Sequence, residues 1–349
     1  MSIIKKIMIT ICASFLLFVC ASCAGKNEII VVDDSLWAEE TILNESGKTE
    51  MTANEPTSAD SIVPEPVSPE VNIPVDTQSE AATVISTDAE TQITEAVAYG
   101  DRDEVYLDPS WRFADHSLIN SGCAVMYRAR SGRKNITIGV NAGHGTEGGT
   151  AQKTYCHPDE TPKTTGGSTK AGSLQAACVS YGMEFDDGTP ESAVTLQMAR
   201  ILRDKLIKEG YDVLMIRDGE DVQLDNVART VICNNAADCH ISLHWDGDSL
   251  DHDKGVFYAS VPDGIKYLDN VAAVWQESER LGESVVSALV SGGCTAYNGG
   301  SIDIDLTQTS YSTIPSVDLE LGNQASDHSE TNLYKMGDMI VDGINHYFN

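Results

Sequence analysis

The stretch ITIGVNAGHGTEGG, residues 136–149, is the point from which the fold of this chain can be predicted. Its apolar beginning has the length of a buried strand, and it breaks off into a glycine-rich turn. His144 lies in that turn between Gly143 and Gly145. In open α/β sheets, functional sites form beyond the carboxyl ends of the strands, so we expect this turn to border one. A phosphate-binding loop is excluded, because no Gly-Lys-Ser/Thr comes after the turn.

The rest of the chain alternates between strand-like and helix-like segments. Strands are expected at residues 136–142, 211–218, 238–246, 254–261 and 315–322, and helices at residues 191–210, 222–236, 277–293 and 329–347. This alternation predicts an α/β fold with a mixed, mainly parallel central sheet flanked by helices on both faces. Residues 150–189 do not follow this alternation of strands and helices. They form a long polar insertion that should border the site, and insertions of this size are usually functional or disordered.

The N-terminal region predicts export. Lys5 and Lys6 precede an apolar run, residues 7–19, that is too short to span a bilayer comfortably and is typical of a signal peptide. The residues before Cys23 are similar to a bacterial lipobox, so we expect a signal peptide at residues 1–23 and a lipid on Cys23. An ordinary signal peptide cut nearby is the alternative. Either way, the protein is expected in the cell envelope.

Residues 24–106 differ in composition from the C-terminal two thirds of the chain. Between residues 24 and 100 there are 2 lysines, no arginine and 16 acidic residues, which gives a net charge of −14. A segment rich in Thr, Ser, Pro and Glu cannot bury enough apolar surface to offset its ordering entropy. We therefore predict a disordered acidic linker at residues 24–106 and a catalytic domain at residues 107–349.

The charge of the chain limits its partners. The formal net charge is −30, and there is no basic patch of the kind that nucleic-acid binding requires. Membrane contact is expected through the N-terminal lipid anchor only, and we expect a monomer. Six cysteines lie beyond the signal region, in spacings that match neither a zinc ribbon nor a CxxC motif, and their pairing stays open.

Two histidines and two glutamates should converge at one edge of the sheet. His144 and His244 end predicted strands, Glu320 lies near the end of another, and Glu191 opens a helix. Two imidazoles and one carboxylate are a known ligand set for catalytic zinc, with a water in the fourth position. A further carboxylate can carry protons. Glu191 could instead be placed by the helix macrodipole alone, and spacing by itself leaves the question open.

His240 is an alternative ligand in the same predicted strand as His244. The two residues share a face of the strand, but only the end position reaches the loop edge. His244 is therefore the expected ligand. Glu320 comes after Val317 and Leu319 in its strand, and we expect it on the same side as they are, in a partly desolvated site where its pKa is raised.

Four motifs occur in a specific order: GHG, a glutamate opening a helix, SLHWD and VDLELG. Between residues 136 and 347 the chain resembles the zinc-dependent N-acetylmuramoyl-L-alanine amidases of the amidase type 3 family. The resemblance implies Zn²⁺ bound by His144, Glu191 and His244, and Glu320 as the catalytic carboxylate. It also implies peptidoglycan as the substrate, cut between N-acetylmuramic acid and L-alanine.

Two points stay open beside this resemblance. The family often has Asp-Pro before GHG, where this chain has Asn141 and Ala142, so a carboxylate that supports a ligand is either missing or supplied elsewhere. The activity also has alternatives. A zinc peptidase that acts on another peptide amide has the same residue set. A catalytically silent wall-binding lipoprotein is the alternative outside enzymes, and it would be suggested if one of the four site residues were absent.

Overall fold

The computed structural model describes residues 99–349, which belong to a unit that spans residues 87–349. The expected signal peptide, Cys23 and all but the last residues of the expected linker lie outside the described residues. Within residues 99–349, no helix is both long enough and apolar enough to cross a membrane.

One eight-stranded sheet organises the domain, with the strand order β1-β2-β6-β3-β7-β10-β8-β9. In that order the strands are Arg102–Tyr106, Cys123–Tyr127, Asp212–Met215, Thr137–Ala142, Cys239–Asp246, Ser316–Asn323, Val256–Ser260 and Ala296–Asp303. Strands β6, β3, β7 and β10 are parallel neighbours, and β8 is parallel to β9. The other three pairings are antiparallel. The predicted mixed, mainly parallel sheet is confirmed.

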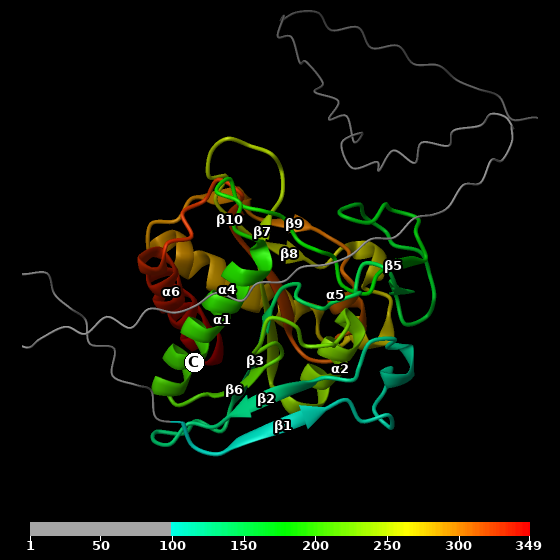
Figure 1. Ribbon diagram of the computed structural model, residues 1–349, viewed down its shortest axis with the longest axis horizontal. Helices are drawn as coiled ribbons and strands as arrows, with labels where there is room; N and C mark the ends of the chain where they lie inside the picture. Colours follow the sequence, from blue (N-terminus) through cyan, green and yellow to red (C-terminus); the bar gives the residue numbers. More distant parts are fainter. Residues whose placement is uncertain (1–98) are drawn as a thin grey trace, which may run out of the picture. The chain divides into compact units, whose positions relative to one another are not determined.

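Helices cover both faces of this sheet (Figure 1). Helices α1 (Glu191–Lys208), α4 (Trp275–Ser291) and α6 (Glu330–Phe348) pack on one face, and α2 (Asn226–Ala236) and α5 (Thr307–Tyr311) lie on the other. A short helix, α3 (Asp269–Ala272), packs near α5. The segment from Val213 to Ile216, which follows Asp212 at the start of β6, is apolar because it is buried on both sides of the sheet. Val213 and Met215 join the core under α1, while Leu214 and Ile216 join the core under α2.

The expected boundary between linker and catalytic domain at residue 106 is wrong. Strand β1 lies within the expected linker and pairs antiparallel with β2 at the edge of the sheet. Four of its five residues are exposed, so the strand is held mainly by backbone hydrogen bonds to one neighbour. Hydropathy therefore gave no signal for it. The ordered domain begins before residue 107.

The insertion at residues 150–189 is folded. Strands β4 (Lys153–Tyr155) and β5 (Gln175–Ala177) form a separate two-stranded antiparallel sheet. The rest of the insertion leads to the start of α1. All six cysteines of the described residues are free thiols.

Candidate metal centre

The turn after β3 places His144 by means of an unusual backbone. His144 has φ +64° and Gly145 has φ +69°, both in the left-handed region that side chains disfavour. A Cβ atom on Gly143 would lie 2.2 Å from the His244 ring, so only glycine fits there. The glycines that flank His144 thus let the chain turn and bring two imidazoles together.

Two buried arginines hold this turn in place. Arg217 donates from Nη2 to the carbonyl of Gly143 at 2.9 Å, and Arg229 donates from Nη2 to the carbonyl of His144 at 2.6 Å. Burial lowers the pKa of Arg217 to about 10 and that of Arg229 to about 9. Neither residue is among those that the sequence patterns indicated. Arg217 comes shortly after β6, and Arg229 lies in α2 between buried apolar residues.

Glu191 is the first residue of α1 and is 2% exposed. Its Oε1 accepts a hydrogen bond from the backbone N–H of Trp245 at 3.1 Å, and its Oε2 accepts one from that of Met183 at 2.9 Å. The helix macrodipole favours a carboxylate at this position. Because Met183 belongs to the insertion, the insertion does border the site, as predicted.

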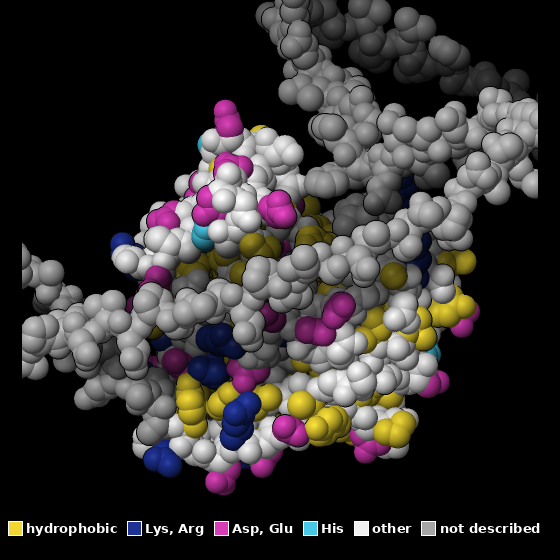
Figure 2. Space-filling model, in the orientation of Figure 1, with side chains coloured by type: hydrophobic (Ala, Val, Ile, Leu, Met, Phe, Trp, Pro, Cys, Tyr) yellow, Lys and Arg dark blue, Asp and Glu magenta, His cyan; other side chains and the backbone are white. Residues whose placement is uncertain are grey.

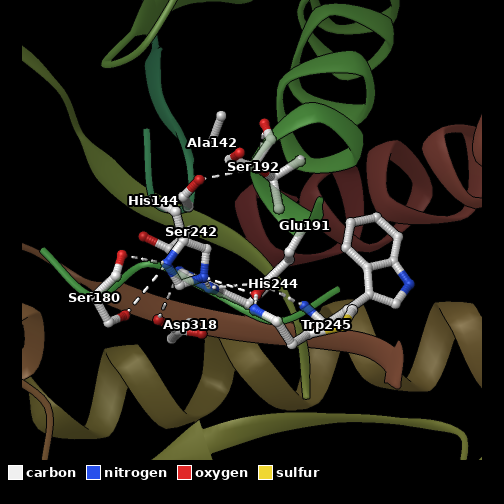
Figure 3. Close-up of polar contacts among 12 residues, drawn as sticks. Ala142, His144, Ser180, Glu191, Ser192, Ser242, His244, Trp245 and Asp318 are labelled. Carbon is white, nitrogen blue, oxygen red and sulfur yellow. Dashed lines mark hydrogen bonds and ion pairs between the residues drawn. The ribbon is translucent and has the colours of Figure 1, made fainter. Parts of the chain in front are cut away.

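His144, Glu191 and His244, hereafter the metal cluster, point toward one another from the turn after β3, from α1 and from β7 (Figure 3). His144 Nε2 lies 2.9 Å from Glu191 Oε2 and 3.0 Å from His244 Nδ1. His244 Nδ1 lies 3.1 Å from Glu191 Oε1. The three residues that were grouped as ligands from the sequence are thus brought together.

This geometry fits a zinc ion. His144 Nδ1 lies 2.9 Å from the carbonyl of Ser180, to which it can donate, and this leaves the Nε2 lone pair free to face the cluster. Tetrahedral bonds of about 2.0–2.1 Å would separate the ligand atoms by roughly 3.3 Å, close to the spacing observed. The donor set of two imidazoles and one carboxylate also matches that of catalytic zinc sites.

The electrostatics of the cluster show that it needs positive charge. Burial raises the pKa of Glu191, but the imidazoles of His144 and His244 outweigh burial and hold that pKa well below its usual range. Burial lowers the pKa of His244, yet the carboxylates of Asp318 and Glu191 raise it to about 10. Protons or a cation therefore compensate the carboxylates here.

Asp318 is a site residue that the sequence patterns did not indicate. It is buried, and its Oδ2 lies 3.7 Å from His244 Nε2, on the side of the ring away from the cluster (Figure 3). It lies on β10, beside β7. Asn141 meanwhile contacts Arg229 and Ser242 rather than a ligand. Asp318 is thus placed to support a ligand, in the role that the sequence left open.

Glu320 lies directly opposite His244 in the parallel pairing of β10 and β7. The expected face was wrong, because strand alternation puts Glu320 with Asp318 and opposite to Val317 and Leu319, which join the core under α4. Burial, with the neighbouring carboxylate of Asp318, raises the pKa of Glu320 well above its usual range. Its Oε2 is buried without a hydrogen-bond partner among the described residues.

His240 does not join the metal cluster. It lies four residues before His244 in β7, is 1% exposed, and burial lowers its pKa to about 3. His240 thus lies inside the sheet and away from its loop edge, as the strand-end argument predicted.

A cleft of about 110 Å³ lies beside His144 and His244 of the metal cluster. Its lining comprises Asn141, His144, Lys163, Ser168, Thr169, Ala176, Ala177, Val179, Ser180, Asn226, Arg229, His244, Leu306, Thr307, Gln308 and Asp318. On the face in Figure 2, acidic side chains gather over the loop between β7 and β8, where Asp251 and Asp253 are exposed.

Comparison with one solved structure supports the fold, and two further amidase structures are similar at a lower score. The apo crystal structure of the amidase Ami1 from Mycobacterium abscessus is 20% identical, has a TM-score of 0.50, and covers 62% of this chain and 99% of its own. Ami1 from Mycobacterium smegmatis is 19% identical, with a TM-score of 0.49 and coverage of 61% and 96%. The CwlD amidase of Clostridioides difficile, in complex with the GerS lipoprotein, is 18% identical, with a TM-score of 0.45 and coverage of 61% and 98%.

No curated protein matches this chain. A family model described as N-acetylmuramoyl-L-alanine amidase, however, matches residues 138–346, which is more than half of the chain. The matched segment begins within β3, ends within α6 and contains every residue of the metal cluster. The chain belongs to the N-acetylmuramoyl-L-alanine amidase family.

Proposed function

We propose that this amidase is a zinc enzyme in which His144, Glu191 and His244 hold the ion and Glu320 carries protons. The observation that supports it most strongly is the convergence of three donor atoms from three separate elements, all within 4.8 Å of one another. When bound, zinc supplies a Lewis acid for the scissile carbonyl and lowers the pKa of a water toward neutrality.

Glu320 is the proton carrier in this proposal. Its carboxylate faces the same side of the sheet as His244 and has an unpartnered, buried oxygen among the described residues. It accepts the proton of the attacking water and then donates it to the amine of L-alanine as the amide breaks. Each of these roles needs a pKa near the working pH, and burial raises the pKa of Glu320 in that direction.

The remaining residues orient the ligands. Ser180 accepts from His144 Nδ1, and Asp318 lies beyond His244 Nε2, so each imidazole presents its other nitrogen to the cluster. Arg217 and Arg229 fix the carbonyls of the turn that carries His144. Substitution of a ligand's support typically reduces metal affinity by 10- to 100-fold, which sets the expected effect of Asp318→Ala at roughly that size.

We also propose that the enzyme acts outside the cytoplasm as a monomer, tethered to the membrane through a lipid on Cys23. The lipobox-like sequence and the acidic residues 24–98 support this arrangement. Cys23→Ser should move the full-length protein from the membrane fraction to the soluble exported fraction. Equal membrane association of both forms would refute the lipid anchor, and sedimentation of the purified protein checks the monomer.

The reaction is tested by digesting purified peptidoglycan with the mature protein and labelling the new amino termini. The proposal predicts new L-alanine amino termini and free lactyl groups on muramic acid, and loss of both in the presence of a chelator, with recovery on addition of zinc. New amino termini on other residues would instead identify a zinc peptidase, and no chelator-sensitive product at all would favour the catalytically silent alternative.

A further inference from the structure

Outside the metal cluster, the most unusual buried charge is on Lys163. It belongs to the insertion, is 7% exposed, and lines the same cleft as His144 and His244. Its backbone is paired within the insertion, where its N–H donates to the carbonyl of Ser173. The side chain is therefore held at the wall of the cleft.

Lys163 forms no ion pair among the described residues, although the Asp305 carboxylate is near enough to oppose part of the effect of burial on its pKa. Its Nζ donates to one acceptor, the backbone carbonyl of Asp305, and no carboxylate lies within ion-pair distance of it. The Asp305 carboxylate is committed to other donors: it accepts from His157 Nε2 at 3.0 Å and from the backbone N–H of Thr164 at 2.6 Å. Burial lowers the pKa of Lys163, which shows the cost of its desolvated charge.

Arg229 is the second cation in the cleft lining, and all its N–H donors already form hydrogen bonds within the domain. Arg229 donates to Asn141, Thr146 and the carbonyls of Ala142, His144 and Leu224, all of them parts of the fold. Lys163 by contrast uses one of the three N–H donors of an ammonium group. An anionic group of the substrate can therefore bind Lys163 without displacing any contact of the fold.

We propose that Lys163 binds a carboxylate of the stem peptide and so selects substrates that carry a free acid at that position. This inference rests on the proposed function, because it places the peptide in the cleft beside the metal cluster. The glycan offers hydroxyl and amide groups there, whereas the stem peptide is the part of the substrate that carries carboxylates. In a domain with a large excess of acidic residues, a buried cation is needed to draw such a group in.

The test uses two product-like peptides, L-Ala-γ-D-Glu-L-Lys with a free α-carboxyl on the glutamyl residue and the same peptide with that carboxyl amidated. Binding to the full mature protein is measured by calorimetry. The parent should bind the free acid roughly ten- to a hundredfold more tightly than the amide. Lys163→Met should bind both peptides equally, at the affinity that the parent has for the amide.

Lys170→Met is the matched control, because Lys170 is an exposed lysine of the same insertion. It should keep the parent's discrimination. Circular dichroism and zinc content of Lys163→Met show whether that variant is folded, and Lys163→Arg, which keeps the charge, should retain part of the preference. Equal binding of both peptides by the parent, or retained discrimination in Lys163→Met, would overturn the proposal.

Hydrolysis by the same proteins separates this inference from the proposed function. Muramyl forms of the two peptides should differ in KM for the parent and not for Lys163→Met. If the parent cuts neither substrate yet still prefers the free-acid peptide, the amidase proposal fails and the carboxylate site stands. If the parent cuts both at equal KM and binds both peptides equally, the amidase stands and the carboxylate site fails.

Discussion

Two buried clusters of histidine and carboxylate lie in this domain, and they behave differently. In the metal cluster, three donor atoms from three elements face one another. In the insertion cluster, made of His157, Lys163 and Asp305, the Asp305 carboxylate instead faces the donors of His157, Thr164 and Ser310. The same residue types thus give a cation site where lone pairs converge and a structural clamp where donors meet an acceptor.

Removing one metal ligand is the strongest test of the difference between the metal cluster and the insertion cluster. His244→Ala should lose both bound zinc and amidase activity, because two of the three ligands cannot hold the ion in the expected geometry. The parent should contain about one zinc per chain. Zinc is measured by atomic absorption after gel filtration, and activity by release of L-alanine amino termini.

His252→Ala is the control, since His252 is exposed on the loop between β7 and β8. It should match the parent in both measurements. Full zinc occupancy in His244→Ala would show that the metal cluster is not the metal site.

A substitution in the insertion cluster should lower the thermal stability of the domain and leave its zinc content unchanged. His157→Ala removes one hydrogen bond from the buried Asp305 carboxylate, which keeps those from Thr164 and Ser310, and a hydrogen bond to a charged group contributes about 1.5–3 kcal/mol. At roughly 2–4 °C per kcal/mol for a domain of about this size, we expect Tm to fall by roughly 3–12 °C. Calorimetric unfolding and zinc content of the same sample check both parts. Loss of zinc together with an unchanged Tm would reverse the roles of the two clusters.

A smaller, pH-dependent effect is expected at Glu320 in the zinc-free protein. Because the pKa of Glu320 is raised in the folded state, the folded protein is penalised once the pH rises above the unfolded-state pKa of about 4.3. Glu320→Gln removes that penalty. The variant should match the parent near pH 4 and exceed it in Tm by an amount that grows as the pH rises toward about 8.

Thermal unfolding in chelator across this pH range measures the difference. Glu184→Gln, in the insertion and outside the metal cluster, is the control and should show no such trend. A Glu320→Gln variant that is less stable than the parent at the alkaline end of the range would contradict a buried, proton-retaining carboxylate.

Much of the fold can be predicted from local sequence. The strand that ends at the GHG turn and the helix that Glu191 opens are apolar-patterned segments whose positions periodicity predicts. Topology then brings their ends to one edge of the sheet, which is why the ligands could be grouped without a structure. Strand β1 escaped prediction because its pairing is made by backbone atoms and its side chains are exposed.

Contacts that depend on register could not be predicted. Asp318 faces His244 only because β10 pairs with β7 in one particular register, and nothing in its own neighbourhood encodes that partner. The same holds for Lys163, whose place in the cleft is set by a hydrogen bond to a carbonyl 142 residues away along the chain. Tertiary packing determines such partners, and the local patterns of a single sequence do not reveal them.

The central claim is that three residues hold the metal while Glu320 moves the proton, and one paired measurement tests it most directly. Bound zinc and the rate of peptidoglycan digestion are determined on the same preparation of Glu320→Gln. We predict zinc content equal to the parent and a loss in turnover of about 10²–10⁴-fold, the usual contribution of general acid–base catalysis. Loss of zinc along with activity would make Glu320 a ligand, and retained activity would assign the proton transfer to another residue.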